Sequence, residues 1–426
     1  MQINKNVQND PTLLSEVEWQ QFEQLKGEFH EELMKSGQSI DIRANEYEPH
    51  LFSWQNKDIA LHWDGILGQQ NRIESKHEVD IGIPKSITSY GLGLRVNIKK
   101  SLAIYAEGRS FILSDTDSLA NTVFNPSLGL PVTKKALVDI TVTDNATSYL
   151  VFRLPWFDFE FGRDLVEWGP GYRGNLILSR NANFYDLVKL TFRYVKFKFE
   201  YFHAFLNSDK TKYLAGHRME IRPSKSLQFA VNETVVYGNR SVEFLYFNPF
   251  VPIMIAERHL GNQDNNIVSF DGTLFLNKYH FKLYTEVLFD DFSFAKNIFN
   301  NFVNKWGILV GGYWAQPFGL QNTDFRFELL RIQPLVYSHT VAINTYSNYN
   351  NVIGHWLGPD ADDWYFEFAH QFHKNFRVTI SWEQRRRGQN DINQGTRPED
   401  SRIHFLAGTV ERNHFYGLRL HWQMHR

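Results

Sequence analysis

Residues 156–182 read WFDFEFGRDLVEWGPGYRGNLILSRNA, and this stretch decides the fold. Its first part alternates strictly, with Phe157, Phe159 and Phe161 on one side and Asp158 and Glu160 on the other. Because successive side chains of a β-strand point to opposite faces, the pattern predicts a strand between an apolar and a wet environment. The second part is broken by glycines around a tryptophan, which predicts a structured loop directly after the strand.

The composition favours a large β-architecture over a single compact core. The chain has 426 residues, more than the roughly 250–300 residues that one core usually reaches. Aromatic residues make up 15% and charged residues 22% of the sequence, and the two classes are interspersed. No apolar run approaches the roughly 20 residues of a transmembrane helix. The strands of a membrane barrel need only alternate over about 10 residues.

Several function classes lack support in the sequence. The chain has no cysteine, which excludes disulfides and thiolate chemistry, and its net charge of -2 gives no basic excess for nucleic acid. The glycine loop at 169–174 lacks the Gly-Lys-Ser/Thr ending of a phosphate-binding loop. No G-x-S-x-G, H-E-x-x-H or diagnostic carboxylate pair is present. We therefore expect no enzyme activity and no cofactor.

The N-terminal part has a different pattern from the rest of the chain. Residues 11–37 carry apolar side chains at helical spacing, so residues 1–45 are predicted to form a short helical segment on the periplasmic side. Residues 46–426 are predicted to be all β. The first ten residues are polar and lack the apolar core of a secretory signal. We expect that the signal peptide is absent from this chain.

The strand pattern recurs along the β region. It is clear at 90–98, 188–194, 195–201 and 416–424, and tight turns such as 99–101 and 374–375 alternate with long connections such as 292–304 and 388–401. Short turns on one rim and long loops on the other are typical of outer-membrane barrels, whose last strand pairs with the first. A soluble sandwich stays open as an alternative, because its half-solvated sheets also alternate.

Charged residues follow the apolar row of the strand that begins at Phe376. The run contains Glu383, Arg385, Arg386 and Arg387, and we predict that alternate members point into the lumen and pair with carboxylates such as Glu367. An internal ion-pair network and an anion-binding site are both compatible with the pattern.

The loop motif resembles the signature of the Wzi-type capsule assembly family of outer-membrane proteins. The resemblance rests on Gly162-Arg163, Trp168-Gly169-Pro170-Gly171, Gly174-Asn175 and Ser179 to Ala182. Further segments agree in order: EFLYFNPFVPIMIAE at 243–257, GGYWAQPFGLQNTDFRFE at 311–328, VYSHTVAINTY at 336–346 and GHWLGPDADDW at 354–364.

The resemblance implies a transmembrane antiparallel β-barrel of about 18 strands in the bacterial outer membrane; a barrel of about 16 strands is also compatible. It further implies a lumen obstructed by folded-in loops and a lectin-like, non-catalytic protein that binds or anchors surface (capsular) polysaccharide. Two other hypotheses stay open. One is a porin-like channel for small solutes, and the other is a structural scaffold that binds other envelope proteins.

The candidate residues come from the motif segments. An aromatic face beside a guanidinium suits a sugar ring that carries a carboxylate. The predicted polysaccharide-binding residues are Trp168, Tyr172, Arg173, Asn175, Arg180 and His355. The predicted structural motif comprises Gly162, Arg163, Gly169, Pro170, Gly171, Gly174, Ser179 and Asn181. No metal site is predicted, although Asp360, Asp362 and Asp363 resemble a cation site in composition without the spacing of a calcium loop.

Overall fold

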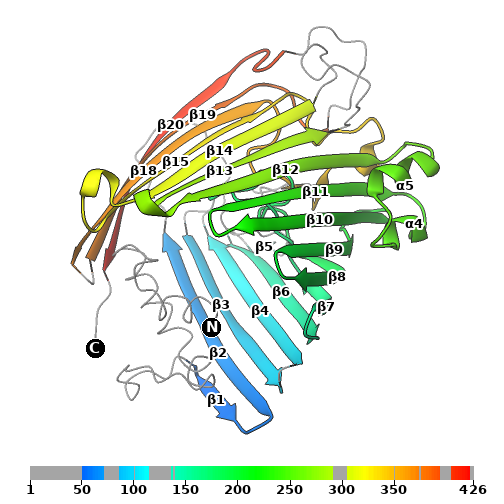
Figure 1. Ribbon diagram of the computed structural model, residues 1–426, viewed down its shortest axis with the longest axis horizontal. Coiled ribbons are helices and arrows are strands. Elements are labelled where there is room, and N and C mark those ends of the chain that lie inside the picture. The colour runs from blue at the N-terminus through cyan, green and yellow to red at the C-terminus, as the bar shows by residue number, and fades with distance from the viewer. Residues whose placement is uncertain are drawn as a thin grey trace.

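Antiparallel strands account for almost all regular structure in this protein (Figure 1). The computed structural model describes residues 50–71, 86–99, 101–114, 136–137, 140–290, 305–349, 351–373, 376–393 and 404–422. These residues form one 18-stranded sheet, of which β1 with 4 residues and β5 with 2 residues are short members, and a separate two-stranded ribbon.

The bounds of the elements are as follows. The strands of the large sheet are β1 (Phe52–Gln55), β2 (Ile59–Asn71), β3 (Ser86–Ile98), β4 (Leu102–Ser114), β5 (Ala136–Leu137), β6 (Ile140–Arg153), β7 (Phe157–Asp164), β8 (Tyr185–Tyr194), β9 (Phe197–Phe205), β10 (Lys212–Ser224), β11 (Leu227–Gly238), β12 (Asn265–Leu276), β13 (Phe281–Asp290), β14 (Lys305–Ala315), β15 (Thr323–Ile332), β18 (Ala361–His373), β19 (Phe376–Arg387) and β20 (Glu411–Trp422). The ribbon consists of β16 (Ser347–Asn348) and β17 (Asn351–Val352). The helices are α4 (Phe244–Phe247), α5 (Ile253–His259), η3 (Asn277–Tyr279), η4 (Pro317–Gly319) and η5 (Ala342–Asn344).

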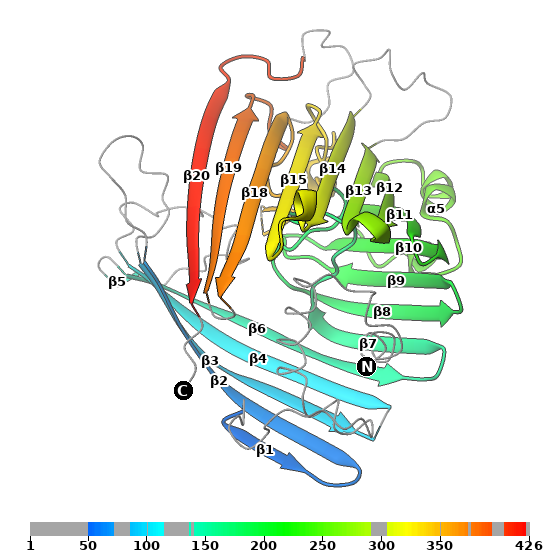
Figure 2. The ribbon, with the colours of Figure 1, turned by 60° about the vertical axis from the view of Figure 1, so that its left-hand side comes forward.

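The long strands pair with their neighbours in the chain. The ladders run from β2–β3 and β3–β4 through β6 to β15, and then through β18 and β19 to β20, always antiparallel. Figure 2 shows the strong curvature of the resulting sheet. Within the described part of the chain, β20 pairs with β19 and β1 pairs with β2, and no ladder joins β20 to β1 or β2.

The connections divide between two rims. The described turns at 154–156, 195–196 and 225–226 are short. The predicted tight turn between β3 and β4 is confirmed by the pairing of Ile98 with Leu102. The connections at 165–184, 239–264 and 333–360 are long. Because successive strands reverse direction, the short turns all lie on one rim and the long connections on the other, as the sequence predicts.

The outer face of the sheet is apolar. The predicted stripe on β7 is confirmed, because Phe161 is 54% exposed while Asp158 and Glu160 are buried on the opposite face. On β20, Tyr416 is 81% exposed and Trp422 is 74% exposed. Such a surface suits lipid, whereas a soluble protein would cover rows of aromatic side chains of this extent.

The inner face carries ion pairs that join adjacent strands or reach across one intervening strand. Lys189 on β8 contacts Glu160 on β7 at 2.7 Å, and Arg218 on β10 contacts Asp271 on β12 at 2.6 Å. The predicted partner of Glu367 is wrong: its Oε1 accepts from Arg326 on β15 at 3.0 Å. Arg326 lies directly opposite Glu367 in the β15–β18 ladder, whereas the residue opposite Glu367 on β19 is Ser381.

Residues 1–45, which the sequence predicts as a helical segment, lie outside the described residues. No helix among the residues described here is long and apolar enough to cross a membrane.

Candidate functional site

The loop between β7 and β8 folds inward and lies against the inner face of the sheet. Leu176, Ile177 and Leu178 are fully buried in the main hydrophobic cluster, and Trp168 is only 2% exposed. The ring of Trp168 meets Phe202 on β9 edge-on at 5.1 Å, and a Cβ added to Gly216 on β10 would lie 3.0 Å from it. We call residues 165–184 the inner segment.

Two glutamates of the sheet bind consecutive backbone N–H groups of the inner segment. Glu328 on β15 accepts from Tyr172 N at 2.7 Å and from Arg173 N at 3.1 Å. Glu286 on β13 accepts from Leu176 N at 2.7 Å and from Ile177 N at 3.0 Å. These contacts satisfy backbone donors that would otherwise be buried without partners, and they fix the segment to the sheet.

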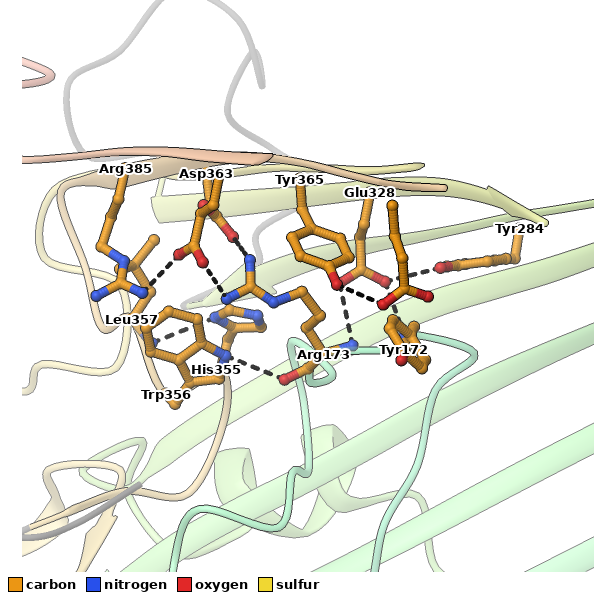
Figure 3. Close-up of polar contacts among 12 residues, drawn as sticks. Tyr172, Arg173, Tyr284, Glu328, His355, Trp356, Leu357, Asp363, Tyr365 and Arg385 are labelled. Carbon is orange, nitrogen blue, oxygen red and sulfur yellow. Dashed lines mark hydrogen bonds and ion pairs between the residues drawn. The ribbon is translucent and has the colours of Figure 1, made fainter. Parts of the chain in front are cut away.

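Arg173 links the inner segment to the C-terminal strands (Figure 3). Its guanidinium contacts Asp363 on β18 at 2.6 Å and Glu383 on β19 at 2.8 Å, and it lies 4.4 Å from the ring centre of Tyr365. Its carbonyl accepts from Trp356 Nε1 at 3.0 Å. Two buried carboxylates therefore neutralise this cation, which reduces its capacity to bind an external anion.

A second folded-in connection, at 333–360, packs against the inner segment. The hydroxyl of Tyr337 donates to Leu176 O at 2.6 Å, and that of Tyr346 donates to Ile177 O at 2.9 Å. His355 is buried beside them, and its Nδ1 accepts from Leu357 N at 3.3 Å. Burial, reinforced by the nearby arginines Arg173 and Arg385, lowers the pKa of His355 from its ordinary value of 6.5 to about 3. This histidine is consequently neutral.

A polar pocket of about 210 Å³ lies at the rim of the long connections. It is lined by Trp356, Leu357, Arg385, Arg387, Glu411 and Asn413.

The two arginines of this pocket differ in their contacts. The guanidinium of Arg385 lies 4.4 Å from the ring centre of Trp356 (Figure 3). It pairs with Glu383 at 2.5 Å, while its buried Nε has no hydrogen-bond partner among the described residues. The exposed side chain of Arg387 has no ion pair among the described residues. The pocket therefore presents the exposed guanidinium of Arg387 together with the aromatic side chain of Trp356.

The structure separates the six predicted binding residues into three groups. Trp168, Asn175 and His355 are buried, and Asn175 Oδ1 accepts from Gly171 N at 2.7 Å. Arg173 is ion-paired with inner-face carboxylates, as described above. Tyr172 is 46% exposed, and Arg180 is exposed and pairs with Glu167 at 2.6 Å.

The predicted motif residues shape the inner segment and its entry. Gly162 has φ 142, Gly169 has φ 126 and Gly174 has φ 158, and a Cβ on any of them would lie under 3.0 Å from another atom. Asn181 donates to Val352 O at 2.5 Å, and Ser179 Oγ accepts from Asn175 N at 3.2 Å. Three further predicted members remain. Arg163 contacts Asp186 at 3.5 Å. Pro170 and Gly171 directly follow Gly169 in the chain.

The three aspartates that resemble a cation site have separate partners. Asp360 accepts from Asn390 and from Leu406 N, Asp362 pairs with Arg386, and Asp363 pairs with Arg173. Among the residues that the structure describes, no group of three or more His, Cys, Asp or Glu side chains is placed to hold a metal ion.

Five residues of the site are not among those predicted from the sequence: Trp356, Glu286, Glu328, Glu411 and Asn413. Trp356 lies within the motif at 354–364, and an aromatic residue in that motif could have been proposed as a sugar contact. The two glutamates occur as ordinary inward residues of alternating strands, and only the folded sheet shows that they face the inner segment.

Comparisons with known proteins agree with this architecture. The family model of the capsule assembly protein Wzi matches residues 135–426. Wzi of Escherichia coli, described as an outer-membrane protein involved in group 1 capsule assembly and a carbohydrate-binding β-barrel, has a similar structure. The TM-score is 0.52 at 13% identity, over 82% of this chain and 73% of that chain.

Two further outer-membrane proteins give lower scores. OmpT of Vibrio cholerae has a TM-score of 0.42 at 11% identity, over 87% of this chain and 99% of that chain. OprD of Pseudomonas aeruginosa has a TM-score of 0.41 at 10% identity, over 85% of this chain and 82% of that chain. No curated protein matches the sequence.

Proposed function

The chain belongs to the Wzi family of capsule assembly proteins of the bacterial outer membrane, and from that premise we propose that it binds or anchors capsular polysaccharide at the cell surface without catalysing a reaction. The carbohydrate binding of the structurally similar Escherichia coli protein supports this proposal.

The pocket at the rim of the long connections carries the proposal. In outer-membrane barrels the longer loops face the outside of the cell, so this rim is where a surface polymer arrives. Trp356 offers an apolar edge, and Arg387 offers an exposed guanidinium that has no ion pair among the described residues. Guanidinium groups bind carboxylates strongly, so we infer that the polymer is acidic.

The proposed roles of the six predicted residues follow from their exposure. Tyr172 and Arg180 remain proposed contacts, because both side chains are accessible. Trp168, Asn175 and His355 are proposed to hold the inner segment in shape, and Arg173 to join it to β18 and β19.

We also propose that the sheet closes into a barrel through β20 and the part of β2 beyond Trp63 that β1 leaves unpaired. Its wall would then contain 16 long strands, and the short strands β1 and β5 bring the total to 18. Unpaired backbone groups at a sheet edge are costly in lipid, and closure removes them.

Titration of purified capsular polysaccharide onto the detergent-folded protein tests the proposed site. Arg387→Ala is expected to weaken binding about tenfold or more, which corresponds to the loss of a charged hydrogen bond of about 1.5–3 kcal/mol. Arg412→Ala is the matched control, because Arg412 precedes Asn413 but lies on the opposite face of β20. Equal affinity of Arg387→Ala and wild type would reject the pocket as the binding site.

Planar-bilayer recordings distinguish this proposal from a channel. The inner segment and the connection at 333–360 pack against each other inside the sheet, so we expect little ion conductance. Robust conductance without glycan binding would favour the porin-like hypothesis.

A further inference from the structure

The connection between β11 and β12, residues 239–264, folds back over the outer face of the sheet. Tyr246 of α4 and Ile253 of α5 form a buried cluster with Tyr213 on β10 and Val235 on β11. The neighbouring residues Leu214 and Val236 belong to the inner cluster that surrounds the inner segment. Because side chains alternate along a strand, Tyr213 and Val235 must point outward. We call residues 239–264 the outer connector.

The outer connector covers polar groups on the outer face. His203 Nε2 and Tyr237 Oη lie 2.8 Å apart, and the hydroxyl of Tyr201 donates to Tyr246 O at 3.1 Å. Glu233 on β11 accepts from Ile253 N at 2.9 Å and from Met254 N at 2.6 Å, at the start of α5. These groups would be costly to expose to hydrocarbon. The outer connector covers all of them and supplies hydrogen-bond partners to Tyr201 and Glu233.

The side of the outer connector that faces away from the sheet is exposed and apolar. Phe244 and Phe250 are each 87% exposed, and Ile255 on α5 is also exposed. Figures 1 and 2 place α5 beside the ends of β10, β11 and β12 at the rim of the long connections. Exposed Met219 and Phe229 continue the apolar surface on the outer face of β10 and β11.

The exposed apolar surface of β10 is shorter than the apolar band that an outer-membrane barrel needs. Below the covered part of β10, the exposed outward positions run from Met219 to Pro223, about 13 Å at about 3.3 Å per residue. A strand tilt of about 40° reduces this to about 10 Å of height, whereas the apolar band of outer-membrane barrels is about 25 Å tall. The missing height falls on the covered part of the wall, where the outer connector supplies the surface.

We propose that the outer connector is embedded in the membrane leaflet nearest the rim of the long connections. Phe244 and Phe250 contact lipid acyl chains, and Arg240 and Arg258 at the ends of the apolar stretch contact the headgroup region. In this arrangement the connector completes the apolar band over a part of the wall whose own side chains are polar.

Single-cysteine labelling tests this placement, since the chain has no cysteine. Phe250→Cys, Met219→Cys and Ser208→Cys are each labelled with an environment-sensitive fluorophore in phospholipid vesicles. Met219 is the control for lipid contact, and Ser208 in the exposed 206–211 connection is the control for water. Quenching is measured with acyl-brominated lipid and with aqueous iodide.

The expected result is that brominated lipid quenches the Phe250→Cys label as strongly as the Met219→Cys label, with iodide quenching several-fold weaker than for Ser208→Cys. Strong iodide quenching would place the connector in water and overturn the proposal. Protection from both quenchers, together with cross-linked dimers of Phe250→Cys, would overturn it in favour of a second copy of the chain.

Discussion

Gly162 lies in β7 at a point where this strand approaches β6 very closely. Its φ is 142, and a Cβ would lie 2.3 Å from the carbonyl oxygen of Ser148 and 2.6 Å from Cα of Tyr149. Both are backbone atoms, which cannot move aside without disturbing the ladder. The inner segment begins directly after β7, so Gly162 also influences where that segment enters the lumen.

We predict that Gly162→Ala lowers the free energy of unfolding by about 1–3 kcal/mol, the usual cost of overpacking. The measurement is urea unfolding in detergent micelles. Gly108→Ala on β4 is the control, because no atom lies within 4 Å of its added Cβ and its φ is not in the left-handed region. That variant should be unchanged or stabilised by up to about 1 kcal/mol. Equal stability of the two variants would contradict the prediction.

His355 predicts a dependence of stability on pH. Burial lowers its pKa from 6.5 to about 3 in the folded protein, so the unfolded chain binds more protons between these values. Stability should therefore fall as pH falls through this window. We expect that the urea midpoint decreases from about pH 7.5 to about pH 4.5, and decreases less in His355→Asn, which retains an acceptor for Leu357 N and does not titrate. Equal decreases in both proteins would assign the effect to other groups.

At the scale of residues, the sequence predicts which residues form a structured loop, but it does not predict which other residues surround them. The motif around Trp168 indicates a structured loop, and this is correct. The burial of Trp168 depends on Phe202 and Gly216, which belong to strands that no local pattern places beside it. Likewise, the carboxylates that neutralise Arg173 follow it by 190 and 210 residues in the chain.

At the scale of elements, the same hydrogen-bonding arrangement occurs on three strands. Glu233, Glu286 and Glu328 each accept two consecutive backbone N–H groups from a long connection. Glu233 does so on the outer face, and the other two on the inner face. A carboxylate has two oxygens and can satisfy both donors, whereas an amide offers only one acceptor oxygen.

We predict that Glu328→Gln loosens the inner segment. One of the N–H groups of Tyr172 and Arg173 then loses its acceptor, at a cost of about 1.5–3 kcal/mol. Hydrogen exchange of these two amides should accelerate about tenfold or more. Glu107→Gln on β4 is the control, because Glu107 contacts Arg109 and Tyr105 rather than the inner segment. Unchanged exchange in Glu328→Gln would show that other contacts hold this turn.

The strands themselves are predictable from the sequence, because alternation is local. The rows at 157–161 and 416–422 have the faces that their patterns predict. The outer connector is not predictable in this way, since its short helices obtain their packing from Tyr213 and Val235 on two other strands.

At the scale of the whole molecule, barrel closure is open to a direct test. Every second backbone N–H of β20 points away from β19. A closed barrel predicts that amides of both sets between Glu411 and Trp422 are protected from exchange in lipid vesicles. Fast exchange of only those amides that point away from β19 would show a free edge at β20. The amides that bond to β19 are the internal control.

The long-range contacts of the inner segment also set an order of assembly. Each long strand pairs with the strand that precedes or follows it in the chain. The inner segment, in contrast, contacts side chains that lie 110, 156, 190 and 210 residues further along the chain. Loops of that length close slowly, and the required side chains are in place only once β13, β15, β18 and β19 have joined the sheet. The lumen therefore fills last, and a chain that stops short of β19 leaves Arg173 without its carboxylate partner Glu383.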